Sequence, residues 1–108
     1  MEHKRLGRTG LKVSRLCLGT MTFGNQCDET ISHAILDYAL DAGISFIDTA
    51  DIYPANGVPE LVGETENIIG RWMKGRRKDV VLATKFWAPT GKNQLKVGDS
   101  RRNILFYV

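Results

Sequence analysis

Short apolar runs and helix-spaced apolar positions alternate along this chain, and the alternation predicts strands and helices in turn. Mixed polar and apolar positions flank a turn between Gly7 and Gly10, which is typical of a β-hairpin over residues 4–14. Three β-favouring runs follow, and the second is apolar enough to predict a strand buried on both faces. The predicted buried strands cover residues 15–19, 44–50 and 80–84.

Two segments between these strands carry apolar residues at steps of three and four, so each is predicted to be an amphipathic helix. The first covers residues 28–42, with Asp28 as the N-cap and Gly43 just past its end. Its predicted apolar stripe consists of Ile31, Ala34, Ile35, Tyr38, Ala39 and Ala42. The second covers residues 65–74, with Thr65 as the cap and a stripe of Ile68, Ile69, Trp72 and Met73.

The order of these elements predicts an α/β fold, because strands that alternate with helices pair in parallel through right-handed crossovers. A third helix is expected to begin at Ser100, after a loop over residues 87–99. Three parallel strands neither close a barrel nor cover both faces of a sheet, and a (β/α)8 barrel needs about 250 residues. We therefore expect residues 1–108 to form the N-terminal hairpin and first three βα units of one TIM-barrel domain, apparently truncated.

Composition narrows the function classes only slightly. The chain is 43% hydrophobic and 25% charged, and no run approaches the ~18 apolar residues of a membrane span. Cys17 and Cys27 lack partners at zinc spacing, so we predict a core thiol and a loop thiol, no metal site, and a cytoplasmic location. The net charge is +3, and several basic residues gather at positions 71–78. Such a cluster fits either a nucleic-acid-binding surface or the solvated C-terminal end of a helix, and we favour the helix end.

Charged residues end two of the predicted strands, and they are the first candidates for chemistry. Asp48 and Lys85 are expected to meet at the carboxyl edge of the sheet, with Tyr53 in the loop that follows Asp48. A cation beside a phenol stabilises the phenolate, so Tyr53 is a candidate general acid and Asp48 would hold Lys85 in place. An ordinary ion pair with a hydrogen-bonded tyrosine fits the spacing equally, and on spacing alone we favour it.

Four blocks of this chain resemble the aldo/keto reductase family in order and spacing. They are residues 6–14 (LGRTGLKVS), 18–24 (LGTMTFG), 41–53 (DAGISFIDTADIY) and 80–86 (VVLATKF). The resemblance implies a barrel that binds NADPH in extended form and reduces aldehydes or ketones, a small-molecule carbonyl substrate, by hydride transfer. It implies that Tyr53 donates the proton, Lys85 activates it and Asp48 supports Lys85. It also implies cofactor contacts from Gly19, Thr20, Met21 and Asp48.

The chain departs from the family pattern after Lys85. The family's fourth catalytic residue is a histidine at the end of the next strand, whereas this chain contains only His3 and His33, which we interpret as solvated or packing residues. The family's main phosphate- and adenine-binding segments also lie in the second half of the barrel. We therefore expect these 108 residues to be inactive alone, or to be a non-catalytic truncated variant that acts through partner association. Trp87 fits either a substrate pocket or simple packing.

Overall fold

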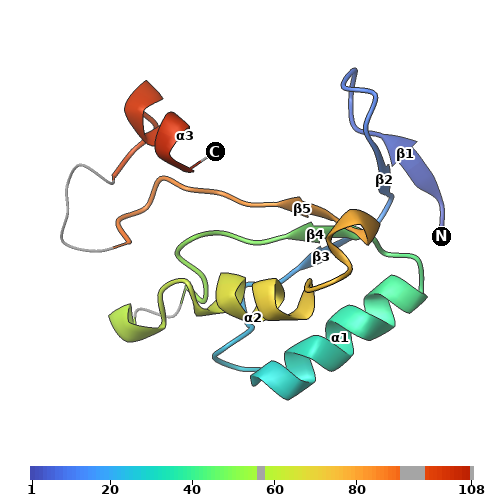
Figure 1. The fold of residues 1–108 in the computed structure, drawn as a ribbon, viewed down its shortest axis with the longest axis horizontal. Helices are drawn as coiled ribbons and strands as arrows, with labels where there is room; N and C mark the ends of the chain where they lie inside the picture. The colour runs from blue at the N-terminus through green and yellow to red at the C-terminus, as the bar shows by residue number, and fades with distance from the viewer. Residues whose placement is uncertain (56–57, 91–96, 108) are drawn as a thin grey trace.

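A three-stranded parallel sheet with two helices on one face forms most of the computed structural model, which describes residues 1–55, 58–90 and 97–107 (Figure 1). The strands of the sheet, in spatial order, are β3 (Cys17–Gly19), β4 (Phe46–Asp48) and β5 (Val81–Ala83). An antiparallel hairpin of β1 (His3–Arg5) and β2 (Lys12–Ser14) precedes them. The helices are α1 (Glu29–Asp41), α2 (Glu64–Trp72) and α3 (Arg101–Tyr107), with 3-10 turns at Pro59–Leu61 and Arg77–Asp79. The α/β class, the hairpin and the parallel sheet are therefore confirmed.

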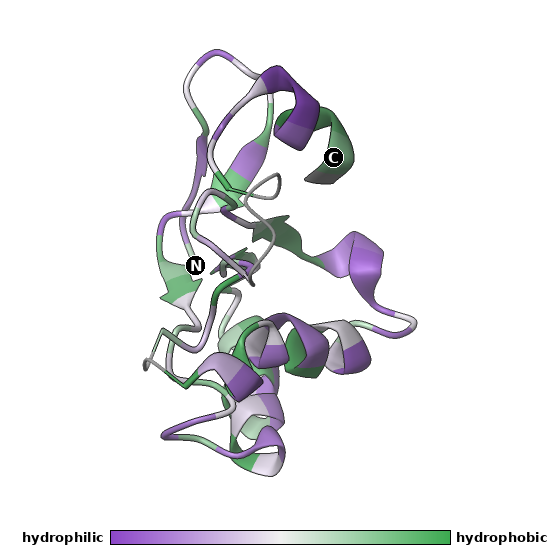
Figure 2. Ribbon diagram, turned by 90° about the vertical axis from the view of Figure 1, so that its left-hand side faces the viewer, coloured by the Kyte–Doolittle hydropathy of each residue, from purple (hydrophilic) through white to green (hydrophobic). Residues whose placement is uncertain are grey.

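The core lies between the sheet and the layer formed by α1 and α2. Its buried members are Phe23, Leu36, Ile47, Ile69, Trp72 and Val80. Figure 2 shows the contrast between the hydrophobic strand β5 and the hydrophilic turn at Arg77–Asp79 that precedes it. Within the described residues, β3 and β5 each pair with β4 alone, so no barrel closes there. No described helix is long and apolar enough to cross a membrane.

The strands are less buried than the sequence predicts. Ile47 is the fully buried residue of β4, and its two neighbours in the strand are half-buried. In β3, Leu18 is half-buried and Cys17 is exposed, so the predictions of a buried strand and a core thiol at Cys17 are wrong for this structure. The physical reason is that helices cover one face of the sheet, and β3 lies at an edge without a second strand beside it.

Helix α1 has the predicted ends, but only part of its predicted stripe packs against the core, namely Ala39 and the partly buried Ile35. The Asp28 carboxylate accepts a hydrogen bond from the Ile31 N–H at 2.8 Å, and Gly43 takes φ = 84° past the C-terminus. The buried residues are Ser32, Leu36 and Ala39, whereas Tyr38 of the predicted stripe is 79% exposed. The predicted stripe also lines an open groove of about 440 Å³ together with Leu18 and Ile44. Apolar residues cover more than one side of α1, so periodicity alone did not select the side that packs.

The N-cap of helix α2 lies two residues before the predicted one. It is Gly63, at φ = 88°, and Thr65 lies inside the first turn. The buried Thr65 hydroxyl donates to the Phe23 carbonyl oxygen at 2.7 Å instead of capping the helix. The prediction of Thr65 as the cap is therefore wrong, because a glycine two residues earlier supplies the left-handed backbone that the turn requires.

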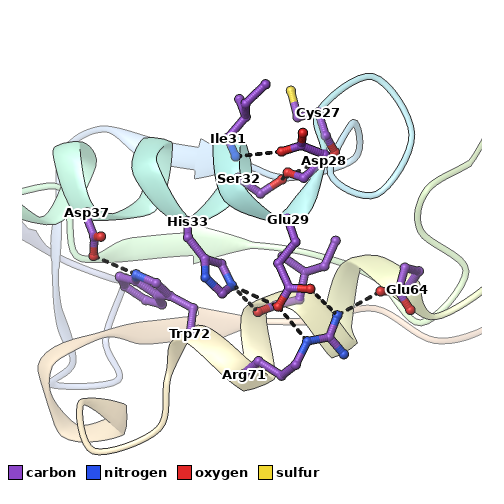
Figure 3. A network of polar contacts seen from close by, with 11 residues as sticks. Cys27, Asp28, Glu29, Ile31, Ser32, His33, Asp37, Glu64, Arg71 and Trp72 are labelled. Carbon is purple, nitrogen blue, oxygen red and sulfur yellow. Dashed lines mark hydrogen bonds and ion pairs between the residues drawn. The ribbon is translucent and has the colours of Figure 1, made fainter.

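Side chains on α1 and α2 join the two helices (Figure 3). Arg71 donates to Glu29 at 2.7 Å and to Glu64 at 2.8 Å. His33 Nε2 lies 3.0 Å from the Ile68 carbonyl oxygen, which confirms His33 as a packing residue. A hydrogen bond from the Arg71 guanidinium holds the pKa of the Glu29 carboxyl below its usual range. The pKa of the Glu64 carboxyl is lowered first by a hydrogen bond from the Asn67 side chain and then by Arg71.

Candidate active site

The register of the sheet brings the ends of its strands together. Asp48 at the end of β4 pairs with Gly19 of β3 on one side and with Ala83 of β5 on the other. Lys85 follows β5 by two residues, and its Nζ donates to Asp48 Oδ2 at 2.6 Å and to the Thr49 carbonyl oxygen at 2.8 Å. The structure thus brings together the two charged strand ends that the sequence singled out.

Tyr53 completes this cluster from the loop after β4. The Lys85 ammonium nitrogen lies 5.0 Å from the centroid of the Tyr53 ring. The Tyr53 N–H donates to the Ala50 carbonyl oxygen at 3.1 Å, which forms a tight turn directly after the strand. That turn returns the phenol to the edge of the sheet where Lys85 lies, so a phenol, an ammonium and a carboxylate form one contiguous polar group.

The charges in the cluster act on one another. Partial burial favours the neutral amine of Lys85, but hydrogen bonding with the Asp48 carboxylate and the Tyr53 phenol outweighs it and raises the pKa of Lys85. Lys85 is therefore an ammonium ion at neutral pH. The Cys17 thiol lies near the same pair: burial and the Asp48 charge raise its pKa, and the Lys85 charge opposes them. A thiol with a raised pKa is a weak nucleophile at neutral pH.

The loop after β3 lies beside Asp48. The buried Thr20 donates its hydroxyl to the Asp48 carbonyl oxygen at 2.8 Å, so this side chain supports the backbone of the site. Gly19 borders open space, since a Cβ built there meets no atom within 4 Å, and Met21 is half-exposed. Gly19 and Met21 are therefore both accessible beside Asp48. Trp87 is 67% exposed, which argues against simple packing of its indole.

Three further residues beside the cluster were missed by the sequence analysis. The Thr84 hydroxyl donates to Glu66 Oε1 at 2.6 Å, and the Asp51 N–H donates to the Lys85 carbonyl oxygen at 3.0 Å. Burial, and secondarily the Glu66 charge, raises the pKa of the Asp51 carboxyl. Strand alternation was the available signal, because it directs the side chains of Thr84 and Lys85 to opposite faces of the sheet.

Comparison with known proteins is consistent with this arrangement. The model of the aldo/keto reductase family matches residues 15–106. The uncharacterized oxidoreductase YrpG of Bacillus subtilis is 55% identical over 92 residues, which are 82% of this chain and 27% of that protein. A probable voltage-gated potassium channel subunit beta of Oryza sativa subsp. japonica is 42% identical over 107 residues, 97% of this chain and 31% of the relative.

A solved structure matches as well. The holo form of aldo-keto reductase AKR11C1 from Bacillus halodurans superposes with a TM-score of 0.68 at 39% identity, over 85% of this chain and 28% of that one. The chain therefore spans less than a third of the length of these relatives. Both the sequence and the fold of this segment are similar to theirs.

Proposed function

This chain belongs to the aldo/keto reductase family of oxidoreductases, and we propose that it carries the proton-donating part of an NADPH-dependent carbonyl reductase site. The observation that carries the proposal is the Lys85 ammonium, which hydrogen-bonds to the Asp48 carboxylate at 2.6 Å and lies 5.0 Å from the Tyr53 ring centroid. The substrate class is a small aldehyde or ketone, and its product is the corresponding alcohol.

Tyr53 is the proton donor in this proposal. A bound NADPH would provide the hydride for the carbonyl carbon, so that negative charge would develop on the carbonyl oxygen. The phenol O–H bond of Tyr53 breaks as its proton passes to that oxygen, and the electron pair stays on the phenolate. Lys85 stabilises the phenolate charge, and Asp48 holds the ammonium beside the ring. Gly19 and Met21 would border the cofactor, and the Thr20 hydroxyl would support Asp48 through its hydrogen bond to the Asp48 carbonyl oxygen.

We further propose that additional βα units complete the site, and that residues 1–108 do not turn over substrate by themselves. The one-sided pairing of β3 and β5 and the open apolar groove along α1 support this, because such surfaces are normally covered in a barrel. His33 lies on α1, and its Nε2 faces α2, 3.0 Å from the Ile68 carbonyl oxygen. A reducing cytoplasmic location accords with Cys17 and Cys27 being free thiols.

The test uses the complete reductase, which here means the full-length native product or residues 1–108 joined to the remaining sequence of the Bacillus subtilis relative. We expect Tyr53→Phe to lower kcat for aldehyde reduction by about 10²- to 10⁴-fold, the usual contribution of a general acid. NADPH affinity, measured by fluorescence quenching, should remain unchanged. Tyr38→Phe is the matched control, because this phenol is 79% exposed on α1. Wild-type turnover in Tyr53→Phe would refute the proposed role.

A second candidate is a non-catalytic chain that acts through partner association. The open groove along α1 and the unpaired edge of β3 favour it, since both offer surface to another polypeptide. The complete reductase distinguishes the candidates when it is mixed with NADPH and a panel of aldehydes, because only the catalytic candidate oxidises NADPH there. Oxidation of NADPH that disappears in Tyr53→Phe would contradict the non-catalytic interpretation.

A further inference from the structure

The first turn of α2 contacts the loops that carry both Tyr53 and Lys85. The Tyr53 carbonyl oxygen accepts hydrogen bonds from Gly63 N–H at 3.0 Å and Thr65 N–H at 3.3 Å. These two donors belong to the start of the helix, where backbone N–H groups lack partners within the helix itself. The backbone of Tyr53 is therefore attached to the N-terminus of α2.

Glu66, in the same turn, attaches the other loop. The Thr84 hydroxyl donates to Glu66 Oε1 at 2.6 Å. Thr84 directly precedes Lys85, and the two side chains reach opposite partners, Glu66 and Asp48. Fixing Thr84 therefore fixes the backbone from which the Lys85 side chain extends.

We propose that Glu66 is a positioning residue that holds the Lys85 ammonium beside the Tyr53 phenol by anchoring Thr84 to α2. The inference rests on the proposed function of Tyr53 and Lys85. One helical turn then sets the separation of proton donor and cation, because it binds the Tyr53 carbonyl on one side and Thr84 on the other.

The other carboxylates nearby do not serve this purpose. Glu64, in the same helical turn, accepts from Arg71 at 2.8 Å and from Asn67 at 3.2 Å, on the side that faces α1. Asp51 contributes its backbone N–H to the Lys85 carbonyl oxygen, while its Oδ2 is buried without a hydrogen-bond partner among the described residues. The side-chain anchor on Thr84 is Glu66.

Substitutions at both ends of this hydrogen bond test the proposal in the complete reductase. We expect Thr84→Val and Glu66→Ala each to lower kcat by about tenfold to a hundredfold, because small displacements of reacting groups cost that much. The KM for the aldehyde and the Kd for NADPH should stay within about twofold of wild type, since neither side chain is among the residues that we propose to contact them. Thr84→Ser and Glu66→Gln keep a donor and an acceptor, and should restore most of kcat.

Glu64→Ala is the matched control, because it removes a carboxylate from the same turn without touching Thr84. Its kcat should equal that of wild type, and its thermal midpoint reports any general loss of α2 stability. Wild-type kcat in Thr84→Val and Glu66→Ala would overturn the positioning role, and so would a failure of Thr84→Ser to recover activity. Inactive Tyr53→Phe beside fully active Thr84→Val would leave the proposed function intact and refute this inference alone.

Discussion

Substitutions at two positions of α1, two residues apart in the sequence, should differ strongly in their effect on stability. Leu36 is 1% exposed and belongs to the core cluster, whereas Tyr38 is 79% exposed. The apolar periodicity of the sequence places Tyr38 on the packed stripe and leaves Leu36 off it. Leu36→Ala and Tyr38→Ala therefore separate the face that the sequence suggests from the face that the structure buries.

The expected loss at Leu36 follows from its burial. Truncation to alanine removes three carbons at about 0.8 kcal/mol each, which gives roughly 2.4 kcal/mol, and the cavity left behind adds to it. We therefore expect a decrease of about 3 kcal/mol in the free energy of unfolding. A domain of this length has about 5–15 kcal/mol in total, so a large share of the stability is lost. Tyr38→Ala should change it by no more than about 0.5 kcal/mol.

Urea unfolding followed by circular dichroism measures both variants. The slope of the transition should match wild type in each case, so that the midpoint alone reports stability. A larger loss in Tyr38→Ala than in Leu36→Ala would show that α1 packs through its other face, and would refute the assignment of the core. Repeating the pair in the complete reductase shows whether the groove along α1 becomes covered, because Tyr38→Ala would then become destabilising.

Two further predictions concern the backbone and pH. Gly43→Ala should lower the free energy of unfolding by about 1–2 kcal/mol, because φ is +84° at this residue and an added Cβ would lie 2.8 Å from the Cβ of Met1. Gly70→Ala is the control, since a Cβ there meets no atom within 4 Å; in the same urea assay it should leave stability unchanged or raise it. Burial, and secondarily the Glu66 charge, raises the pKa of Asp51 in the folded state. Asp51 therefore stabilises the folded state below its unfolded pKa of ~3.9, and this stabilisation is lost as the pH rises through the folded-state pKa. Asp51→Asn should therefore stabilise at pH 7 relative to wild type and show no such gain near pH 3; a constant difference across that range would contradict the shift.

The sequence predicted the sheet, and the meeting of Asp48 and Lys85 at one of its edges, because those features depend on local order. Parallel pairing follows from the alternation of strands and helices, and parallel strands end at one edge. Asp48 and Lys85 were therefore identifiable as neighbours without coordinates, and so were Asp28 as an N-cap and Gly43 as the residue past α1, since capping depends on a few adjacent residues. The roles of these residues in catalysis stay predictions.

What the sequence did not specify was the side of each element that packs. Helix α1 carries apolar residues on more than one face, and the buried Ser32 belongs to the packed one because its hydroxyl donates to the Asp28 carbonyl oxygen at 2.7 Å. A polar residue whose hydrogen bond is local can be buried, and a hydrophobicity pattern counts it as exposed. Thr65 was misassigned for a different reason: its hydroxyl donates to the Phe23 carbonyl oxygen, a contact between segments far apart in the sequence.

The cluster of Asp48, Tyr53 and Lys85 is held together by contacts within this segment. Lys85 donates to Asp48 and Thr49, and the Tyr53 carbonyl is held by the start of α2. None of these bonds requires further strands, so contacts within residues 1–108 are enough to place the phenol, the ammonium and the carboxylate relative to one another. The proposed hydride transfer needs more than these contacts, because a cofactor and a carbonyl substrate must also be enclosed and shielded from water. Substitutions such as Thr84→Val are therefore expected to alter proton donation while leaving cofactor affinity unchanged.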